Sequence, residues 1–550
     1  MCRKLALVMI FVVFMGILTL AFNIQPVEAS STIYIRADGS IDPPTAPIST
    51  LDNVTYTFTG DINDSVVIER DNIVVDGVGY VLQGTGSGAG IDITERSNVT
   101  IKNTQIKTFE FGIRLWQSSN DTISLNNIEN NGYGILLGLS SNNTLSSNLM
   151  NSNRINFGVY GSELYHFFHS VDTSNLVDDK PIYYWVNRYG VEIPSDAGYV
   201  ALVNCTEITI RNLTLTHNRQ GLLLVNTQNS YITNNNLTSN GDGIFVYQSS
   251  NNIIYGNNIA ANKYYGIYLK HFSNYNSISG NNITSNGCGI WLWFSSNNTI
   301  SGNNIMTHDW EGIFIWSFSN YNTISGNTLI NNFCGIWVAD SLSISIIYHN
   351  NFINNLEQVT IPDSGYANRW DDGYPSGGNY WSDYNGIDVN EDGIGDTSYV
   401  INEENKDNYP LMVPYITAAQ MRVLYYDLLE KFNDLLARYN LLNQTYEGLL
   451  GNITNLKEQV DSLNSTCSIV QTSIGSWQQQ VDLLNLTLQI SINELQSQID
   501  SLNSTLISGQ KAIVDELANI RNLMYVFTAA TVVLIATMVY FAKRKPKKEP

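Results

Sequence analysis

Short runs in which aliphatic residues alternate with polar or aromatic ones follow a glycine and recur along most of the chain. In "GIWLWFSSNNTISGNN" the residues one and three places after Gly289 are aliphatic, and "GIFIWSFSNYNTISGN" repeats the pattern from Gly312. Such runs begin at Gly90, Gly112, Gly134, Gly158, Gly221, Gly243, Gly266, Gly289, Gly312 and Gly335. The steps are 22 to 24 residues, except for one of 63 residues after Gly158. A constant period of this size predicts a solenoid, and the long step predicts an excursion around "DDKPIYYWVNRYG".

Each repeat contains three alternating runs that are separated by Asn, Ser and Gly. Period-two alternation is typical of strands, and the polar clusters are typical of turns. Three strands per turn of about 23 residues predict a parallel β-helix, an all-β fold. A leucine-rich repeat would need leucines at fixed offsets and a helical segment, and a β-propeller would need longer blades.

Stacked coils place equivalent residues of successive repeats above one another, about 4.8 Å apart. We therefore expect side-chain amide ladders at the corners, for example from Asn281, Asn304 and Asn327. Cys288 and Cys334 are 46 residues apart, hence two coils or about 10 Å along the axis. This exceeds the Cα separation of about 7 Å that a disulfide allows, so we expect two free, buried thiols.

An aromatic column follows from the same alternation. If the residues one and three places after each glycine face the core, the residues two and four places after it face outward. The predicted outward aromatic residues are Phe245, Tyr268, Trp291, Trp293, Phe314, Trp316 and Trp337. An exposed apolar strip of this kind marks a binding site for glycans or for a protein partner. The alternative is that the aromatic-rich segment that follows, "RWDDGYPSGGNYW", covers the strip.

A different pattern, with apolar residues at alternating steps of three and four, begins at Met421 and continues to Leu488. This pattern predicts a coiled coil over residues 416–523, with a stutter at Ile492. We favour a straight stalk that forms a parallel homo-oligomer, in which copies of Cys467 face one another. The alternative is an antiparallel hairpin that turns near Gly475.

Both ends of the chain carry apolar segments. Arg3 and Lys4, an apolar run and a small-x-small site predict a cleaved signal peptide over residues 1–29. The uncharged run over residues 524–542 predicts a transmembrane helix, and the basic tail 543–550 is expected in the cytoplasm. These features predict a single-pass protein of the cell membrane with most of the chain outside the cell.

The composition narrows the expected partners. The formal net charge is −21, which argues against nucleic acid because phosphate binding needs clustered Lys and Arg. Five cysteines do not form a disulfide framework. Asn-x-Ser/Thr sequons from Asn53 to Asn503 are compatible with a glycoprotein.

The acidic loop "DVNEDGIGD" has the spacing of a calcium loop, with Gly393 at the sharp turn. The predicted ligands are Asp388, Asn390, Asp392, the Ile394 carbonyl and Asp396. Position twelve is Tyr399 where a calcium loop has Glu, so the completing ligand must come from elsewhere, with Asp371, Asp372 and Asp383 as candidates. We expect calcium in a structural role.

The repeats, the excursion "DTSNLVDDKPIYYWVN" and the block "RWDDGYPSGGNYWSDYNGIDVNEDGIGD" resemble the NosD-like right-handed β-helix proteins of archaeal cell surfaces, over about residues 50–412. The resemblance implies a right-handed coil, with labels of copper binding or of carbohydrate binding and sugar hydrolysis. Copper prefers clustered His, Cys or Met ligands. Only two of the six histidines, in "HFFH", are close in sequence, so we do not expect copper. The acids Asp92, Glu95, Glu110, Asp242, Asp309 and Glu311 fall mostly in different columns, and we identify no catalytic constellation.

We therefore expect seven parts along the chain. They are a signal peptide (1–29), an N-terminal cap (30–60), the β-helix (61–360), a Gly/Asp/aromatic cap with the calcium-type loop (361–415), the coiled coil (416–523), the transmembrane helix (524–542) and the tail (543–550). The predicted function is adhesion or carbohydrate binding at the cell surface. A polysaccharide hydrolase or lyase and a structural envelope component are the alternatives.

Overall fold

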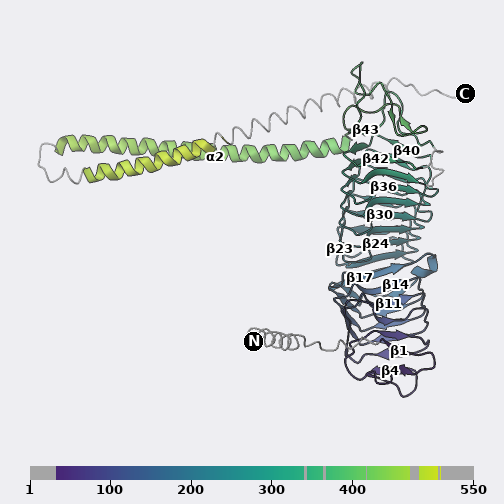
Figure 1. The fold of residues 1–550 in the computed structure, drawn as a ribbon. Coiled ribbons are helices and arrows are strands. Elements are labelled where there is room, and N and C mark those ends of the chain that lie inside the picture. The colour runs from purple at the N-terminus through teal and green to yellow at the C-terminus, as the bar shows by residue number, and fades with distance from the viewer. Residues whose placement is uncertain are drawn as a thin grey trace, which may run out of the picture. The chain divides into compact units, whose positions relative to one another are not determined.

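The computed structural model describes residues 32–339, 344–362, 367–416, 418–470, 482–505 and 508. The chain forms two compact units, Met1–Tyr415 and Ile416–Pro550 (Figure 1). The predicted signal peptide, transmembrane helix and basic tail lie outside the described residues. None of the helices within the described ranges is long and apolar enough to cross a membrane.

The first unit is a right-handed β-solenoid of about 14 turns, which confirms the predicted fold class for this part of the chain (Figure 1). The solenoid has two halves, residues 33–177 and 199–360, which we call the first and second half-solenoids. One long sheet, which we call the shared sheet, runs through both.

Two further sheets complete the first half-solenoid. One comprises β1 (Ile33–Ile35), β2 (Ile41–Asp42), β5 (Val66–Ile68), β8 (Ala89–Asp92), β11 (Phe111–Trp116), β14 (Tyr133–Gly138) and β17 (Ile155–Tyr160). The other comprises β3 (Ile48–Ser49), β4 (Thr55–Phe58), β6 (Val74–Asp76), β9 (Thr100–Lys102), β12 (Thr122–Ser124), β15 (Thr144–Ser146) and β18 (Ser170–Val171). A 3-10 helix, η1 (Leu164–Phe167), lies between β17 and β18.

Two other sheets complete the second half-solenoid. One comprises β22 (Thr209–Arg211), β25 (Tyr231–Thr233), β28 (Ile253–Tyr255), β31 (Ser277–Ser279), β34 (Thr299–Ser301), β37 (Thr323–Ser325) and β40 (Ile346–Tyr348). The other comprises β23 (Thr214–Thr216), β26 (Asn236–Thr238), β29 (Asn258–Ala260), β32 (Asn282–Thr284), β35 (Asn304–Met306), β38 (Thr328–Ile330), β41 (Asn351–Ile353) and β43 (Tyr380–Trp381).

The shared sheet has 14 strands. In spatial order they are β7 (Val81–Gln83), β10 (Gln105–Lys107), β13 (Asn127–Glu129), β16 (Leu149–Asn151), β19 (Leu176–Val177), β20 (Lys180–Val186), β21 (Tyr199–Val203), β24 (Gln220–Val225), β27 (Asp242–Tyr247), β30 (Tyr265–Lys270), β33 (Cys288–Trp293), β36 (Glu311–Trp316), β39 (Cys334–Ala339) and β42 (Glu357–Thr360). All neighbours are parallel except β19 and β20, which pair antiparallel at the predicted excursion. Strand direction therefore reverses between the two halves.

This reversal moves the solenoid interior to the opposite face of the shared sheet. A right-handed coil that keeps advancing along the same axis, but whose strands run the other way, must close on the other side of the sheet. The side chains agree: Ala201 and Val203 of β21 belong to the core of the first half-solenoid, whereas Val200 and Leu202 belong to the core of the second. Both faces of the sheet are buried at this junction.

Asparagine ladders and the glycine column hold the coils in register. Asn281, Asn303 and Asn327 are buried and bonded amide to amide, each Nδ2 donating to the next Oδ1 at 2.9 Å. The predicted ladder residue Asn304 is wrong by one position, because Asn304 bonds Asn282 in a separate outer column. A Cβ on Gly289 would lie 2.3 Å from the carbonyl oxygen of Gly312, so the close stacking of coils requires glycine there. The predicted free thiols of Cys288 and Cys334 are confirmed.

The C-terminal cap closes the open end of the second core. The indole of Trp381 is buried between Phe352 and Tyr399, with ring centroids 4.2 Å from each, and Trp370 packs beside it. The carboxylate of Asp407 accepts hydrogen bonds from the Trp381 indole and the Asn379 amide. Two short antiparallel strands, β44 (Tyr399–Val400) and β45 (Lys406–Asp407), complete the cap.

The second unit contains the long helix α2 (Ala418–Val470) and a helical segment over residues 482–505. Side chains from both line one apolar cavity: Ile453, Leu456, Lys457 and Val460 from α2, with Ile492, Leu495, Gln496 and Ile499. The segment 482–505 lies back along α2, which is the arrangement of an antiparallel hairpin (Figure 1). The expected straight stalk is therefore wrong within the described residues, because the apolar seam packs against its own chain. Homo-oligomerisation stays a prediction.

Candidate functional site

The predicted aromatic column lies on the outer face of the second half-solenoid. Paired strands align Phe245 with Tyr268, Tyr268 with Trp291, Trp291 with Phe314, and Phe314 with Trp337. The column two residues further on brings Trp293 beside Trp316. The sequence-derived register is therefore correct along the whole column.

Exposure along the column differs from the prediction. Phe245 and Tyr268 are only 6% and 7% exposed, because they pack into the core of the first half-solenoid. On the next three coils, Trp291, Phe314 and Trp337 are half-buried and reach the surface. The cause is the change of face at the junction: the outer face of β27 and β30 continues the inner face of the first half-solenoid.

The covering segment is also not the one expected. The following aromatic-rich module buries Trp370 and Trp381 in the second core and does not use them against the strip. Cover comes instead from the preceding segment around η1, where Phe167 packs on Tyr247 at 5.4 Å and the Tyr247 hydroxyl donates to the Ser162 carbonyl.

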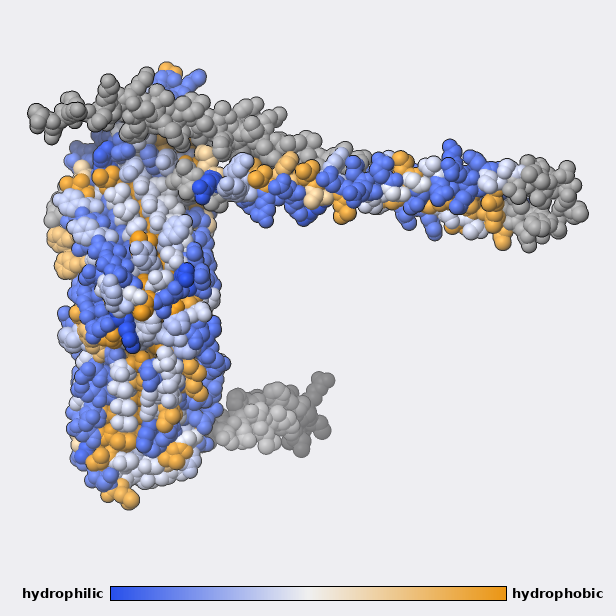
Figure 2. All heavy atoms as spheres, turned by 180° about the vertical axis from the view of Figure 1, so that it is seen from behind, coloured by the Kyte–Doolittle hydropathy of each residue, from blue (hydrophilic) through white to orange (hydrophobic). Residues whose placement is uncertain are grey.

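Five aromatic side chains form the surface that we call the aromatic strip: Trp291, Trp293, Phe314, Trp316 and Trp337. Trp293 and Trp316 stack with centroids 5.2 Å apart and planes 20° apart. Trp291 lies 4.9 Å from Phe314, which lies 5.9 Å from Trp337. The contacts are continuous, so the strip spans three successive coils. Figure 2 shows one face of the solenoid, on which hydrophilic and hydrophobic residues are interspersed.

A buried lysine lies beside this strip, in register with Trp293 on the preceding strand. The Nζ of Lys270 lies 4.8 Å from the ring centroid of Trp293, and its side chain is buried. Burial lowers the pKa of Lys270 from its usual value. The Lys270 side chain therefore contacts the Trp293 ring by a cation–π interaction and helps to hold it in place.

A small cleft, which we call the seam cleft, lies where the two halves meet. It has a volume of about 210 Å³ and is lined by Tyr133, Arg154 and Ile155 from the first half, and by Ser239, Asn240, Gly241, Ala261, Lys263 and Tyr264 from the second. Tyr264 and Tyr265 lie 6.4 Å apart, and Tyr265 contacts Trp291 at 4.7 Å. The seam cleft therefore adjoins one end of the aromatic strip.

Cations surround the tyrosines of the seam cleft. The guanidinium of Arg219 and the ammonium of Lys263 lie 4.9 and 5.0 Å from the ring centroid of Tyr264. Burial raises the pKa of the Tyr264 hydroxyl, but its hydrogen bond to Lys263 and the nearby charges lower it more, so its pKa lies below the ordinary value. The side chains of Tyr133 and Tyr264 lie close enough for each to affect the pKa of the other. The sequence did not predict this cleft, because the 63-residue step indicates an excursion without showing which strands meet across it.

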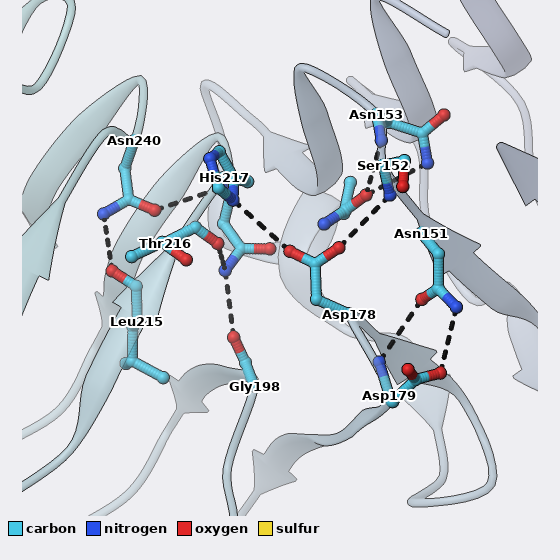
Figure 3. A network of polar contacts seen from close by, with 12 residues as sticks. Asn151, Ser152, Asn153, Asp178, Asp179, Gly198, Leu215, Thr216, His217 and Asn240 are labelled. Atoms are coloured by element: carbon cyan, nitrogen blue, oxygen red, sulfur yellow. Dashed lines mark hydrogen bonds and ion pairs between the residues drawn. The ribbon is translucent and has the colours of Figure 1, made fainter. Parts of the chain in front are cut away.

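A polar network also crosses the junction (Figure 3). The carboxylate of Asp178 accepts from the Ser152 amide at 3.2 Å and lies 3.3 Å from His217 Nδ1, so it connects the two half-solenoids. Asp179 and Asn151 exchange two hydrogen bonds beside it. These contacts stabilise the junction.

The calcium-type loop adopts a compact turn. Gly393 has φ +87°, as a sharp turn at this position requires. The two carboxylate oxygens of Asp388 accept the amides of Asp392 and Gly393, and Asp396 accepts the Val389 amide.

The three candidate completing carboxylates of this loop are engaged elsewhere. Asp371 binds Asn408, Asp372 pairs with Arg369, and Asp383 accepts from Tyr399. The loop thus has the turn and spacing of a calcium loop, but within the described residues its carboxylates are not grouped around one centre and a completing protein ligand is not assembled.

The histidines are dispersed. His169 is buried, which lowers its pKa to about 4, and its Nε2 faces the His166 carbonyl. His308 bonds Asn286, His217 faces Asp178, and His349 faces the Ser376 carbonyl. In the part of the chain that the structure describes, no three His, Cys, Asp or Glu residues are grouped to hold a metal ion. These residues do not fit a copper site.

Several acids considered as catalytic candidates form ion pairs. Asp92 pairs with Arg114, and Glu110 pairs with Arg154 at 2.7 Å. Asp242 pairs with Arg219 at 2.6 Å. The partners of Asp92 and Asp242 lie on the adjacent coil, and that of Glu110 lies two coils away, so these three carboxylates are neutralised by nearby cations.

The fold and its surface define a right-handed parallel β-helix protein. Residues 49–206 match the family model described as the right handed beta helix region. Residues 186–333 and 289–386 match the model described as periplasmic copper-binding protein (NosD). The chain is a NosD-like right-handed β-helix protein. The comparison with curated proteins gave no match.

Several solved structures are similar to this chain. The Dettilon tailspike protein shares 17% identity over 54% of this chain and 62% of its own, with TM-score 0.26. The mannuronan C-5 epimerase AlgE6 A-module of Azotobacter vinelandii shares 17% over 61% and 88%, with TM-score 0.29. The alginate lyase AlyF-OU02 shares 14% over 56% and 80%, with TM-score 0.25. The match spans less than two thirds of the tailspike chain, and similarity at these values concerns the type of fold alone.

Proposed function

We propose that this protein binds carbohydrate through the aromatic strip. The observation that carries the proposal is the continuous set of half-buried rings of Trp291, Trp293, Phe314, Trp316 and Trp337 on an outer sheet face. Half-buried tryptophans are held by their neighbours and still present a ring face or edge to solvent. Rigid aromatic side chains of this kind bind ligands at low cost in conformational entropy.

The strip suits an extended ligand. Coils are about 4.8 Å apart, so rings on successive coils form a line of contacts along the solenoid axis. A polysaccharide chain presents a repeated apolar ring face that such a line can contact. A compact ligand would instead need an enclosing pocket.

Binding of the full-length protein to a glycan array tests this proposal. Trp293→Ala and Trp316→Ala should each weaken binding about tenfold or more, equivalent to about 1.4 kcal/mol. Tyr255→Ala is the matched control, because Tyr255 is an exposed aromatic residue on β28, in another sheet of the same half. Unchanged binding in both tryptophan variants would contradict the proposal.

The proposed setting is the cell surface, with adhesion as the consequence of binding. This rests on the apolar runs near the two ends and on the basic tail after residue 542. Recovery of the full chain in the membrane fraction, and its release when residues 524–550 are deleted, would support it. Recovery of the full chain in the soluble fraction would contradict it.

A hydrolase or lyase and a structural envelope component remain the alternative functions. Release of reducing or unsaturated ends from a bound polysaccharide would identify the enzyme. Dense arrays at the surface without glycan binding would identify the structural component.

We also propose that the loop 388–396 binds calcium in a structural role, with solvent completing the ligand set. Added Ca²⁺ should raise the melting temperature of the wild type after EDTA treatment, and Asp392→Asn should reduce this shift. Asp179→Asn, a change of the same type outside the loop, is the control. Equal shifts in both variants would contradict the site.

A further inference from the structure

The seam cleft has the charge and size of a subsite for one anionic group. Its volume of about 210 Å³ is below the range of about 300–1,000 Å³ for pockets that enclose a small molecule. It therefore suits one substituent or one ring of a longer ligand. Walls come from both half-solenoids, so the cleft exists only where strand direction reverses.

The local charge is positive in a chain whose net charge is −21. Arg154 and Arg219 are balanced by Glu110 and Asp242. Lys263 is exposed, and within the described residues no carboxylate lies at ion-pair distance from it. The cleft therefore carries one uncompensated positive charge, with two guanidinium groups nearby.

The polar groups of the cleft complement a carboxylate. An ammonium group and tyrosine hydroxyls donate hydrogen bonds, and charged hydrogen bonds are about twice as strong as neutral ones. The Tyr264 ring is already covered by Arg219 and Lys263, and Tyr265 continues the aromatic surface towards Trp291. A sugar whose ring lies against Tyr265 and Trp291 would place an acidic substituent near Lys263.

We propose that the seam cleft binds the carboxylate of an acidic sugar at the end of the aromatic strip. The ligand class is thus a polyuronate and not a neutral glycan. This inference rests on the proposed function, because the aromatic strip holds the rest of the polymer. Lys263 provides the main charge, and the hydroxyl of Tyr264 provides orientation.

The test compares two forms of one polymer. Binding of the full-length protein to oligogalacturonate and to its methyl ester is measured by calorimetry, since esterification removes the charge and keeps the backbone. We expect the acid to bind at least tenfold more tightly than the ester. Lys263→Gln should remove this difference, and Tyr264→Phe should reduce it. Lys406→Gln, at an exposed lysine of the cap, is the control and should have no effect.

The outcomes separate this inference from the function on which it rests. Equal binding of acid and ester, still lost in Trp293→Ala, would overturn the anionic subsite and keep the aromatic strip. A preference for the acid that survives in Lys263→Gln would overturn the assignment to the seam cleft. Failure of both forms and of neutral glycans to bind would overturn the inference together with the proposed function.

Discussion

Two adjacent asparagines, Asn303 and Asn304, should differ sharply in their contribution to stability. Asn303 points into the corner ladder, whereas Asn304 points to the outer surface. The reason is that successive side chains point to opposite sides of the chain where it enters β35. The perturbation is Asn303→Ala, and Asn304→Ala is the matched control. Both variants lose the same side-chain atoms, at adjacent positions in the sequence.

The magnitude follows from the hydrogen bonds that each side chain makes. The Nδ2 of Asn303 donates to Asn327 and to the Ile278 carbonyl at 2.9 Å, and its Oδ1 accepts from the amide and Nδ2 of Asn281 at 3.0 and 2.9 Å. Truncation leaves the buried backbone amide of Asn281 without its acceptor. Each buried bond contributes about 0.5–1.5 kcal/mol, and an unsatisfied group costs about 1–3 kcal/mol, so we expect a loss of about 2–5 kcal/mol.

The control should be nearly neutral. Asn304 donates one bond to Asn282 on the outer surface, where water replaces it, and the expected loss is below about 1 kcal/mol. Urea unfolding of the full chain, followed by tryptophan fluorescence, reports on the solenoid because nine of the ten tryptophans precede Tyr415. An equal or larger loss in Asn304→Ala would refute the ladder assignment and the coil register on which the aromatic strip depends.

Three further predictions concern other parts of the molecule. Burial raises the pKa of Asp407 to about 6, so its contribution to stability is full below about pH 3.8 and is lost as the pH rises through 6. The fall in unfolding free energy between pH 4 and 7 should therefore be smaller in Asp407→Asn than in the wild type. A pH profile identical to that of the wild type would contradict this. Phe245→Ala should cost about 3–5 kcal/mol in urea unfolding, because the ring is buried at the junction, while the exposed Phe318→Ala should cost less than about 1 kcal/mol; similar losses would argue against burial at the junction. Oxidation of the double variant Leu456→Cys/Gln496→Cys should give an intramolecular disulfide and a monomer on a non-reducing gel, whereas a disulfide-linked dimer would restore the straight stalk.

Much of the solenoid could be predicted because its determinants are local. Alternation within each run specifies which side chains face inward, and the repeat length specifies which residues stack. The register of Trp291 over Phe314 and the free state of Cys288 follow from these two facts. The ladder was misplaced by one residue at Asn304, since two adjacent asparagines occupy that turn and composition does not distinguish them.

The exposure of the site could not be predicted in the same way. Phe245 and Trp291 occupy equivalent positions in the repeat, yet one is buried and the other reaches the surface. The coil of Phe245 lies closer to the first half-solenoid, whose core covers the ring, whereas the coil of Trp291 lies further along the axis. Likewise, Lys263 and Tyr133 meet in the seam cleft although they are far apart in sequence.

The amino-acid sequence by itself determined a coil of three short strands per turn, the columns of stacked residues and the apolar seam of the helical unit, because these depend on periodicity along the chain. Only the tertiary structure decided that strand direction reverses between β19 and β20, that the core changes to the other face of the shared sheet, and that the helical seam packs on itself. These features depend on pairing between segments that lie far apart along the chain. A repeat pattern specifies what each coil buries, but the surface left uncovered depends on what the next segment packs against.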